Sequence, residues 1–359
     1  MPSETAKTFI NIGNVHLKQG FHIQALDDFS HALEIQRQML PAHHADIAES
    51  QLGRAQAYKK LGFKQEAMVS INEAYNICRK SASLMPSCMT LNVANLLINI
   101  GSKYQNQNLY SKSLECYKEA LEIQRKWLPA LHSDISKTLA VIGSVYRVQG
   151  ELDKAVNYYK EALHMAKRTL PIEDQYIAAT IIGMGTAYKK MDLIDEAEKY
   201  LGEAADMCKR HAYNFLLVQA LNQYGDVCAI KGLYYEALFS FREALQIEKQ
   251  AMPLNFAKLA SISKKIGVIY ARQDHMVEAL ETCKELLDFQ KRAFPPNYSE
   301  IAHCLTDIGI IYEKLGQFEQ ALKFYYDGLE MRRETLHGGH PDIQKSCKLI
   351  DSLINREHG

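Results

Sequence analysis

The fold is indicated by residues 136–169, which read SKTLAVIGSVYRVQGELDKAVNYYKEALHMAKRT. Small and aromatic residues follow each other there, in the order Gly143, Tyr146, Ala155, Tyr159 and Ala162. Within each half of the stretch the steps are three or four positions, which is the spacing of one helix face and not of a strand. The stretch therefore predicts two amphipathic helices joined by a short turn.

The same pattern recurs along the chain, mostly at intervals of 42 residues. The first small residue of each copy of the pattern is Gly13, Ala55, Gly101, Gly143, Gly185, Gly225, Gly267 or Gly309. One helix pair cannot bury its apolar face alone, so a regular array of pairs predicts stacked repeats. We expect an all-α, right-handed superhelical solenoid of eight helix-pair repeats plus a C-terminal capping helix.

Turn residues and prolines set the predicted boundaries. The turn inside a repeat holds Gly20, Gly62, Gly150, Gly232 and Gly316, or Asn108, Asp192 and Asp274, all of which tolerate a left-handed backbone. Pro41, Pro86, Pro129, Pro171, Pro253 and Pro295 follow second helices. We predict one repeat domain over 1–359, with repeats at about 6–39, 48–81, 94–127, 136–169, 178–211, 218–251, 260–293 and 302–335.

The two ends of the array differ in pattern. A capping helix is predicted at about 341–357, because the polar Asp351 stands where another small residue would fall. We therefore expect the solenoid to end there. The N-terminus shows no comparable cap, which favours a truncated chain or an N-terminal contact.

Composition excludes several function classes. Lys+Arg and Asp+Glu both number 42, so the net charge is zero, which argues against a nucleic-acid binder and against a polybasic membrane anchor. Neither a long apolar run nor a signal peptide is present. The eight cysteines form no CxxC pair, which favours free thiols in a reducing cytoplasm.

Candidate catalytic and metal motifs are weak. HGGH at 337–340 contains two potential metal ligands, but it falls at a repeat boundary where similar phrases such as LPAHHADIA recur, so a turn is favoured. The motifs HExxH, GxxxxGK[ST] and GxSxG are absent. We therefore expect no enzymatic activity, no cofactor and no metal site.

The pattern of small, aromatic and alanine residues resembles the tetratricopeptide repeat. Its long 42-residue form, as in ALEIQRQMLPAHHADIA, looks like the repeats of kinesin light chains and related adaptors. The resemblance covers nearly the whole chain and implies a solenoid that binds partner peptides in its concave groove. Kinesin light chains carry a heptad coiled coil before their repeats, and this chain has none there. We therefore expect that the motor heavy chain is not bound through this segment.

The resemblance also implies which residues line the groove. In such superhelices the residues one and four places after the small residue of each first helix face inward. In the first five repeats the polar residues at these places are Asn14, Gln56, Lys59, Ser102, Gln105, Ser144, Arg147, Thr186 and Lys189. Amides can pair with a peptide backbone and cations with carboxylates, so we expect an extended, acidic peptide ligand. The opposing interpretation is that these cations are ordinary solvated charges.

Three functions fit these observations. The leading one is a non-enzymatic protein-interaction scaffold or adaptor, similar to a kinesin light chain, which binds a protein or peptide but neither nucleic acid nor membrane. The alternative is the sensor or docking arm of a larger multidomain enzyme. A third is self-assembly through the last three repeats, where the inward places hold mainly small or apolar residues, with Asp226 and Glu313 as the acids.

Overall fold

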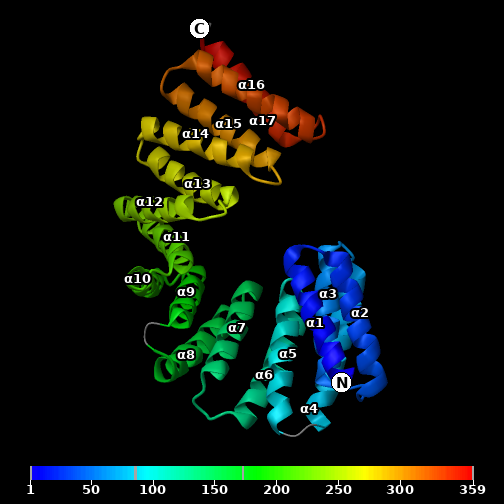
Figure 1. The fold of residues 1–359 in the computed structure, drawn as a ribbon. Helices are drawn as coiled ribbons and strands as arrows, with labels where there is room; N and C mark the ends of the chain where they lie inside the picture. Colours follow the sequence, from blue (N-terminus) through cyan, green and yellow to red (C-terminus); the bar gives the residue numbers. More distant parts are fainter. Residues whose placement is uncertain (1, 85–86, 172–173, 358–359) are drawn as a thin grey trace. The chain divides into compact units, whose positions relative to one another are not determined.

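The computed structural model describes residues 2–84, 87–171 and 174–357. These residues form seventeen α-helices and no strand. Figure 1 shows the helices in their order along the chain. The predicted all-α class and the helix-pair architecture of a repeat solenoid are confirmed. The chain divides into two compact units, residues 1–187 and 188–359, which we describe separately.

The helices follow each other in eight pairs. The first unit contains α1 (Pro2–Gln19), α2 (His22–Met39), α3 (Ala45–Lys60), α4 (Lys64–Leu84), α5 (Ser87–Gln105), α6 (Tyr110–Trp127), α7 (Ser133–Gln149) and α8 (Leu152–Thr169). Helix α9 (Gln175–Lys190) spans the boundary. The second unit continues with α10 (Ile194–Arg210), α11 (Asn214–Ile230), α12 (Tyr234–Gln250), α13 (Phe256–Arg272), α14 (Met276–Arg292), α15 (Tyr298–Lys314), α16 (Phe318–Thr335) and α17 (Pro341–Glu357).

The turns inside the repeats have the predicted left-handed backbone. Gly20, Gly62, Gly150, Gly232 and Gly316 have φ values between 73° and 88°, and Asn108, Asp192 and Asp274 lie at 60–62°. The sequence did not predict a positive φ for Ala212, which has 55° at the shortened repeat boundary. Pro86 lies outside the described residues.

A histidine caps the N-terminus of each of three helices, α3, α7 and α17. The Nδ1 atoms of His44, His132 and His340 accept hydrogen bonds from the backbone N–H two residues later, at 3.3, 3.1 and 3.2 Å. Each bond satisfies one of the free N–H groups at a helix N-terminus. The HGGH segment therefore forms a turn with a capping histidine, as the turn interpretation predicted.

Glycines inside the helices of the first unit pack against aromatic rings. Tyr159 is 3% exposed and lies between Gly143 and Gly183, where added Cβ atoms would stand 3.1 and 2.7 Å from its ring. Phe29 lies in the same way between Gly13 and Gly53. The glycines thus allow first and second helices to approach closely, and the ring fills the remaining space.

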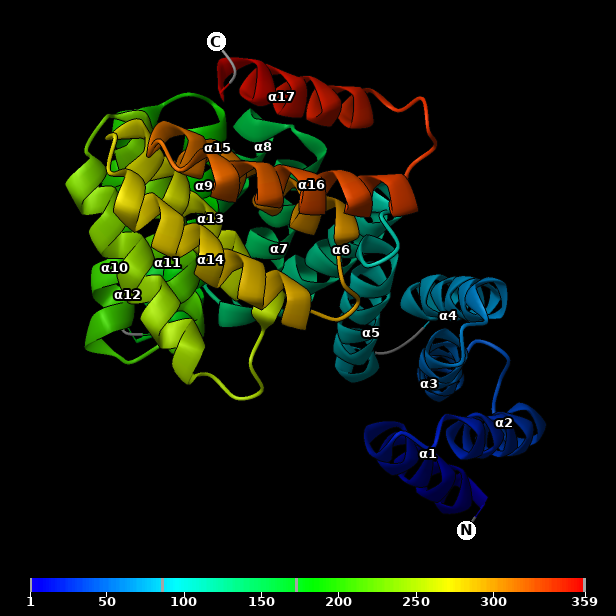
Figure 2. The same cartoon turned by 90° about the horizontal axis from the view of Figure 1, so that it is seen from above.

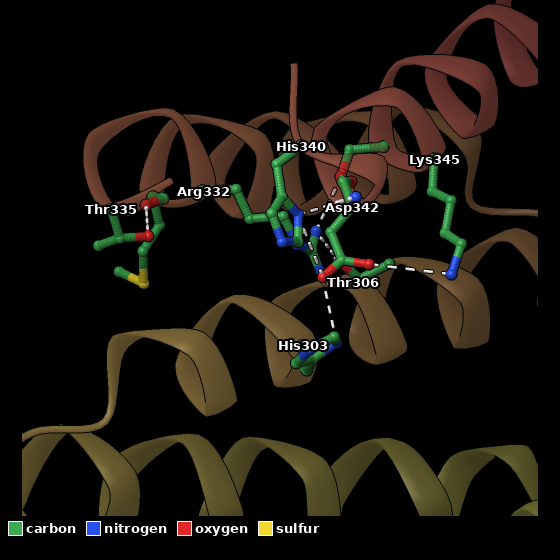
Figure 3. A network of polar contacts seen from close by, with 9 residues as sticks. His303, Thr306, Arg332, Thr335, His340, Asp342 and Lys345 are labelled. Carbon is green, nitrogen blue, oxygen red and sulfur yellow. Dashed lines mark hydrogen bonds and ion pairs between the residues drawn. The ribbon is translucent and has the colours of Figure 1, made fainter. Parts of the chain in front are cut away.

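The capping helix α17 packs beside α16 (Figure 2) and is joined to it by a buried arginine. Arg332 of α16 is only 5% exposed, and burial lowers its pKa. Its guanidinium donates to Thr306 Oγ1 of α15 and to Ser346 Oγ of α17, both at 2.8 Å, and approaches His303 Nδ1 at 3.4 Å (Figure 3). One side chain therefore connects three helices.

We expect Arg332→Met to destabilise the protein by about 1–3 kcal/mol, because it leaves the Thr306 and Ser346 hydroxyls without this partner. Urea unfolding measures the change. Arg333→Met is the matched control, since the neighbouring side chain is exposed and its replacement should stay within about 0.5 kcal/mol. Equal effects of the two variants would contradict the role given to Arg332.

Candidate functional site

The predicted groove residues all lie on the first helices of their pairs. Asn14, Gln56, Lys59 and Ser102 are exposed, and Gln105, Ser144, Arg147, Thr186 and Lys189 are half-buried. In the first unit α3 contacts both α1 and α5, so the first helices form a common surface. Lys189 belongs to the second unit and is treated there.

A hollow of about 240 Å³ opens between α1, α3 and α5. We call it the unit 1 hollow. Three predicted residues, Asn14, Gln56 and Ser102, line it together. Its remaining polar lining is Glu49, Asn99 and Lys103, and its apolar lining includes Ile10, Phe29, Leu52 and Leu96. Amide, hydroxyl and charged groups thus converge over an apolar base, which is the usual composition of a ligand site.

Lys103 lines this hollow, and Lys59, which is not one of the lining residues, is close enough for the two cations to repel each other. Burial lowers the pKa of Lys103, and the nearby charge of Lys59 lowers it further. Among the described residues, neither ammonium group has an ion-pair or hydrogen-bond partner. An anion placed between them would relieve both the repulsion and the loss of solvation. This arrangement favours a carboxylate or another anionic group as the ligand.

Tyrosine hydroxyls hold several side chains at the positions predicted to face inward. The Tyr117 hydroxyl donates to Gln105 Oε1 at 3.2 Å, and Arg147 Nε donates to the Tyr159 hydroxyl at 3.4 Å. In the second unit the Tyr325 hydroxyl donates to Glu313 Oε2 at 2.7 Å. Each pair is separated by the same twelve residues. The core tyrosine of a second helix therefore also orients a side chain on the first helix.

Lys189 is not an isolated cation. Its Nζ lies 2.8 Å from Asp226 Oδ2, and the other oxygen of Asp226 lies 2.7 Å from Lys265 Nζ. The sequence interpretation treated Lys189 and Asp226 as separate groove positions and overlooked this pair. One carboxylate therefore neutralises part of the positive charge that Lys189 was expected to present.

A second hollow, of about 540 Å³, is lined by α11 and α13 in the second unit. Ile230 and Val268 expose 59% and 46% of their surface there, and Lys189, Asp226, Lys265 and Arg272 stand around them. We call it the unit 2 hollow. Its apolar base agrees with the small and apolar residues expected at the inward places of the later repeats.

Neither a metal cluster nor a membrane span is found in the described part of the chain. Within residues 2–84, 87–171 and 174–357, no three His, Cys, Asp or Glu side chains are grouped so as to hold a metal ion. Over the same residues, no helix combines the length and apolar character needed to cross a membrane.

The sequence matches the profile of the tetratricopeptide repeat over residues 4–80, 92–168 and 258–334, which is more than half of the chain. The chain belongs to the tetratricopeptide repeat family. This confirms the resemblance derived from the small and aromatic residues. No curated protein matches the chain in sequence.

Solved structures with the same fold include other tetratricopeptide repeat proteins. A Podosopora anserina protein described as a kinesin light chain with nearly identical TPR-like repeats is 20% identical, with a TM-score of 0.50 over 58% of this chain and 98% of that one. A Rap protein complexed with competence and sporulation factor is 12% identical, with a TM-score of 0.52 over 99% and 98%.

A third similar structure is a signal transduction ATPase with numerous domains from Pyrococcus horikoshii, which has a tetratricopeptide repeat sensor. It is 13% identical, with a TM-score of 0.60 over 95% of this chain and 50% of that one. At such identities the three likenesses show the fold alone. This tetratricopeptide repeat protein therefore has the architecture of an interaction scaffold, and its structural neighbours are in part similar to kinesin light chains.

Three polar residues of the unit 1 hollow were missing from the sequence prediction, namely Glu49, Asn99 and Lys103. The prediction covered only the residues one and four places after the small residue of each first helix, and these three residues stand elsewhere on their helices. Lys103 follows Ser102 directly and Asn99 lies one helical turn before Lys103. A prediction that took in more positions on the inward face of each first helix would have included Asn99 and Lys103.

Proposed function

We propose that this tetratricopeptide repeat protein is a non-enzymatic adaptor that binds an extended, acidic peptide segment of a partner protein. The binding surface consists of the inward residues of α1, α3, α5 and α7, together with Thr186 in the part of α9 that belongs to the first unit. The observation that carries the proposal is the pair Lys59 and Lys103, two mutually repelling cations beside a hollow lined by Asn14, Gln56 and Ser102.

Each class of residue has a role in this proposal. Lys59, Lys103 and Arg147 meet carboxylates, and Arg147 is held for this by the Tyr159 hydroxyl. Asn14, Gln56 and Gln105 pair with the peptide backbone. Ser144 and Thr186 would add further hydroxyl contacts. We expect micromolar affinity, about −8 kcal/mol, because ordering a flexible peptide opposes binding.

The neighbours in structure support an adaptor role. One is described as a kinesin light chain, and another was solved with competence and sporulation factor bound. By this analogy the protein acts in the cytoplasm as a cargo adaptor similar to a kinesin light chain. The proposal includes no nucleic-acid, membrane or motor heavy-chain binding through these residues.

A second candidate function is a sensor or docking arm of a multidomain enzyme. It is favoured by the likeness to the ATPase with a tetratricopeptide repeat sensor, half of which this chain covers. The same peptide-binding surface would then report ligand binding to a catalytic domain. A catalytic or nucleotide-binding domain encoded next to this chain in the gene would favour this candidate over the adaptor.

A comparative pull-down tests the proposed adaptor function. Wild type and Lys59→Glu/Arg147→Glu are used to capture proteins from lysate, and mass spectrometry identifies the partners. Circular dichroism checks that both forms are folded, as expected for exposed or half-exposed charges. We expect the double variant to lose a discrete set of partners that share acidic segments. Retention of the same partners by the folded variant would refute binding at this surface.

A further inference from the structure

The unit 1 hollow is lined by a carboxylate as well as by the cation of Lys103. Glu49 of α3 lines the same hollow as Lys103 of α5. The surrounding protein raises the pKa of Glu49 by partial desolvation, Asp46 raises it further, and Lys7 of α1 opposes the shift. Among the described residues, Glu49 has neither an ion-pair nor a hydrogen-bond partner. The hollow thus presents two unpaired charges of opposite sign.

The two residues stand at different levels along the helices that line the hollow. Glu49 lies six residues before the small residue Ala55, and Lys103 lies two residues after its equivalent, Gly101. Because α3 and α5 have equivalent places in their repeats, this offset of eight residues corresponds to about 12 Å along the helix direction. A free amino acid, whose ammonium and carboxylate share one carbon atom, is too short for this span. A peptide segment is long enough.

A uniformly acidic ligand fits only part of this hollow. Carboxylates beside Lys59 and Lys103 are favourable, but a carboxylate beside Glu49 would be repelled. A ligand cation beside Glu49 would instead form an ion pair inside a partly desolvated hollow, where such pairs are stronger than in open water. Between the two ends, Asn14, Gln56 and Asn99 can hydrogen-bond a peptide backbone.

We propose that the unit 1 hollow selects a peptide segment of mixed charge, with a Lys or Arg side chain at Glu49 and an Asp or Glu side chain at Lys103 and Lys59. This inference rests on the proposed function and makes it more specific. It assigns Glu49 as a specificity-determining residue, which fixes the register and direction of the bound segment. The span of about 12 Å corresponds to about four residues of extended chain between the two ligand charges.

Synthetic peptides test this proposal on the full chain. Four fluorescein-labelled peptides share a neutral Gly/Ser/Ala sequence and differ only in charge. The first carries no charge, the second two glutamates, the third a lysine four residues before the glutamates, and the fourth a lysine four residues after them. Fluorescence anisotropy at low salt gives each Kd, first for wild type.

For wild type, one of the two lysine-containing peptides should bind with a Kd at least about fivefold below that of the glutamate-only peptide, and the peptide with lysine on the opposite side should gain less. Glu49→Gln should abolish that gain while leaving the affinity for the glutamate-only peptide unchanged or higher. Glu34→Gln, at an exposed carboxylate of α2, is the matched control and should retain the gain. Far-ultraviolet circular dichroism verifies that each variant is folded.

The outcomes separate this inference from the proposed function. If the glutamate peptide binds better than the neutral one but lysine adds nothing in either order, the mixed-charge inference is wrong and the acidic-peptide function stands. The mixed-charge inference is equally wrong if Glu49→Gln keeps the gain from lysine. If the glutamate peptide binds no better than the neutral one, the proposed function itself is wrong.

Discussion

Gly143→Leu is expected to lower the stability of the protein by at least about 1–3 kcal/mol through overpacking. A Cβ atom at this position would stand 3.1 Å from Tyr159 Cδ1 and 3.2 Å from the backbone oxygen of Ala155. The ring could move only by displacing the neighbouring repeat, and the backbone oxygen belongs to helix α8. The larger leucine side chain would therefore force α7 and α8 apart.

The thermal midpoint followed by circular dichroism measures this effect. Gly338→Leu is the matched control, because nothing lies within 4 Å of a Cβ at that loop position. The control should keep the wild-type midpoint while Gly143→Leu lowers it by several degrees. An unchanged midpoint for Gly143→Leu would show that the assigned repeat register is wrong. We expect the same response from Gly185→Leu, which occupies the equivalent place in the next repeat.

Tyr159→Ala is expected to destabilise the protein by about 3–5 kcal/mol, the usual cost of removing a buried aromatic side chain. The ring contacts two glycines, Gly143 of its own repeat and Gly183 of the next, so its loss opens a cavity between repeats. Because repeat stability depends on contacts between neighbours, the damage should spread along the stack. Urea unfolding gives the change in free energy.

Tyr159→Phe separates packing from the hydroxyl contact. It keeps the ring, so its cost should be only about 0.5–1.5 kcal/mol, the contribution of one hydrogen bond. It also frees Arg147 from the bond that orients its side chain. A Phe variant as unstable as the Ala variant would contradict the central role given to ring packing.

The repeated features of the fold could be predicted because each depends on local sequence. Gly150 and Asp192 adopt a left-handed backbone because residues of their type tolerate it, whatever surrounds them. Gly143 and Tyr159 meet because helical spacing alone puts them on facing surfaces. One departure is Gly267, where an added Cβ would stand 3.5 Å from the Sγ of Cys283, because Cys283 occupies the aromatic place in that repeat.

The candidate site could be predicted less completely, because it depends on contacts between repeats. The inward places included Asn14, Gln56 and Ser102, which do share one hollow. Lys189 stands four residues after the small residue of its repeat, and Asp226 stands one residue after the small residue of the next repeat. The two side chains form an ion pair. A comparison of these two positions in adjacent repeats would have revealed the pair. The connection that Arg332 makes between three helices has no equivalent in the repeat pattern.

The most direct test of the acidic-peptide function is the anisotropy titration of the two-glutamate peptide against the full chain, beside the neutral peptide. The proposal predicts that wild type binds the glutamate peptide more tightly, that added salt weakens this preference, and that folded Lys59→Glu/Arg147→Glu loses it. Equal affinities of wild type for the two peptides, or an unchanged preference in the double variant, would contradict the proposal that this surface binds acidic segments.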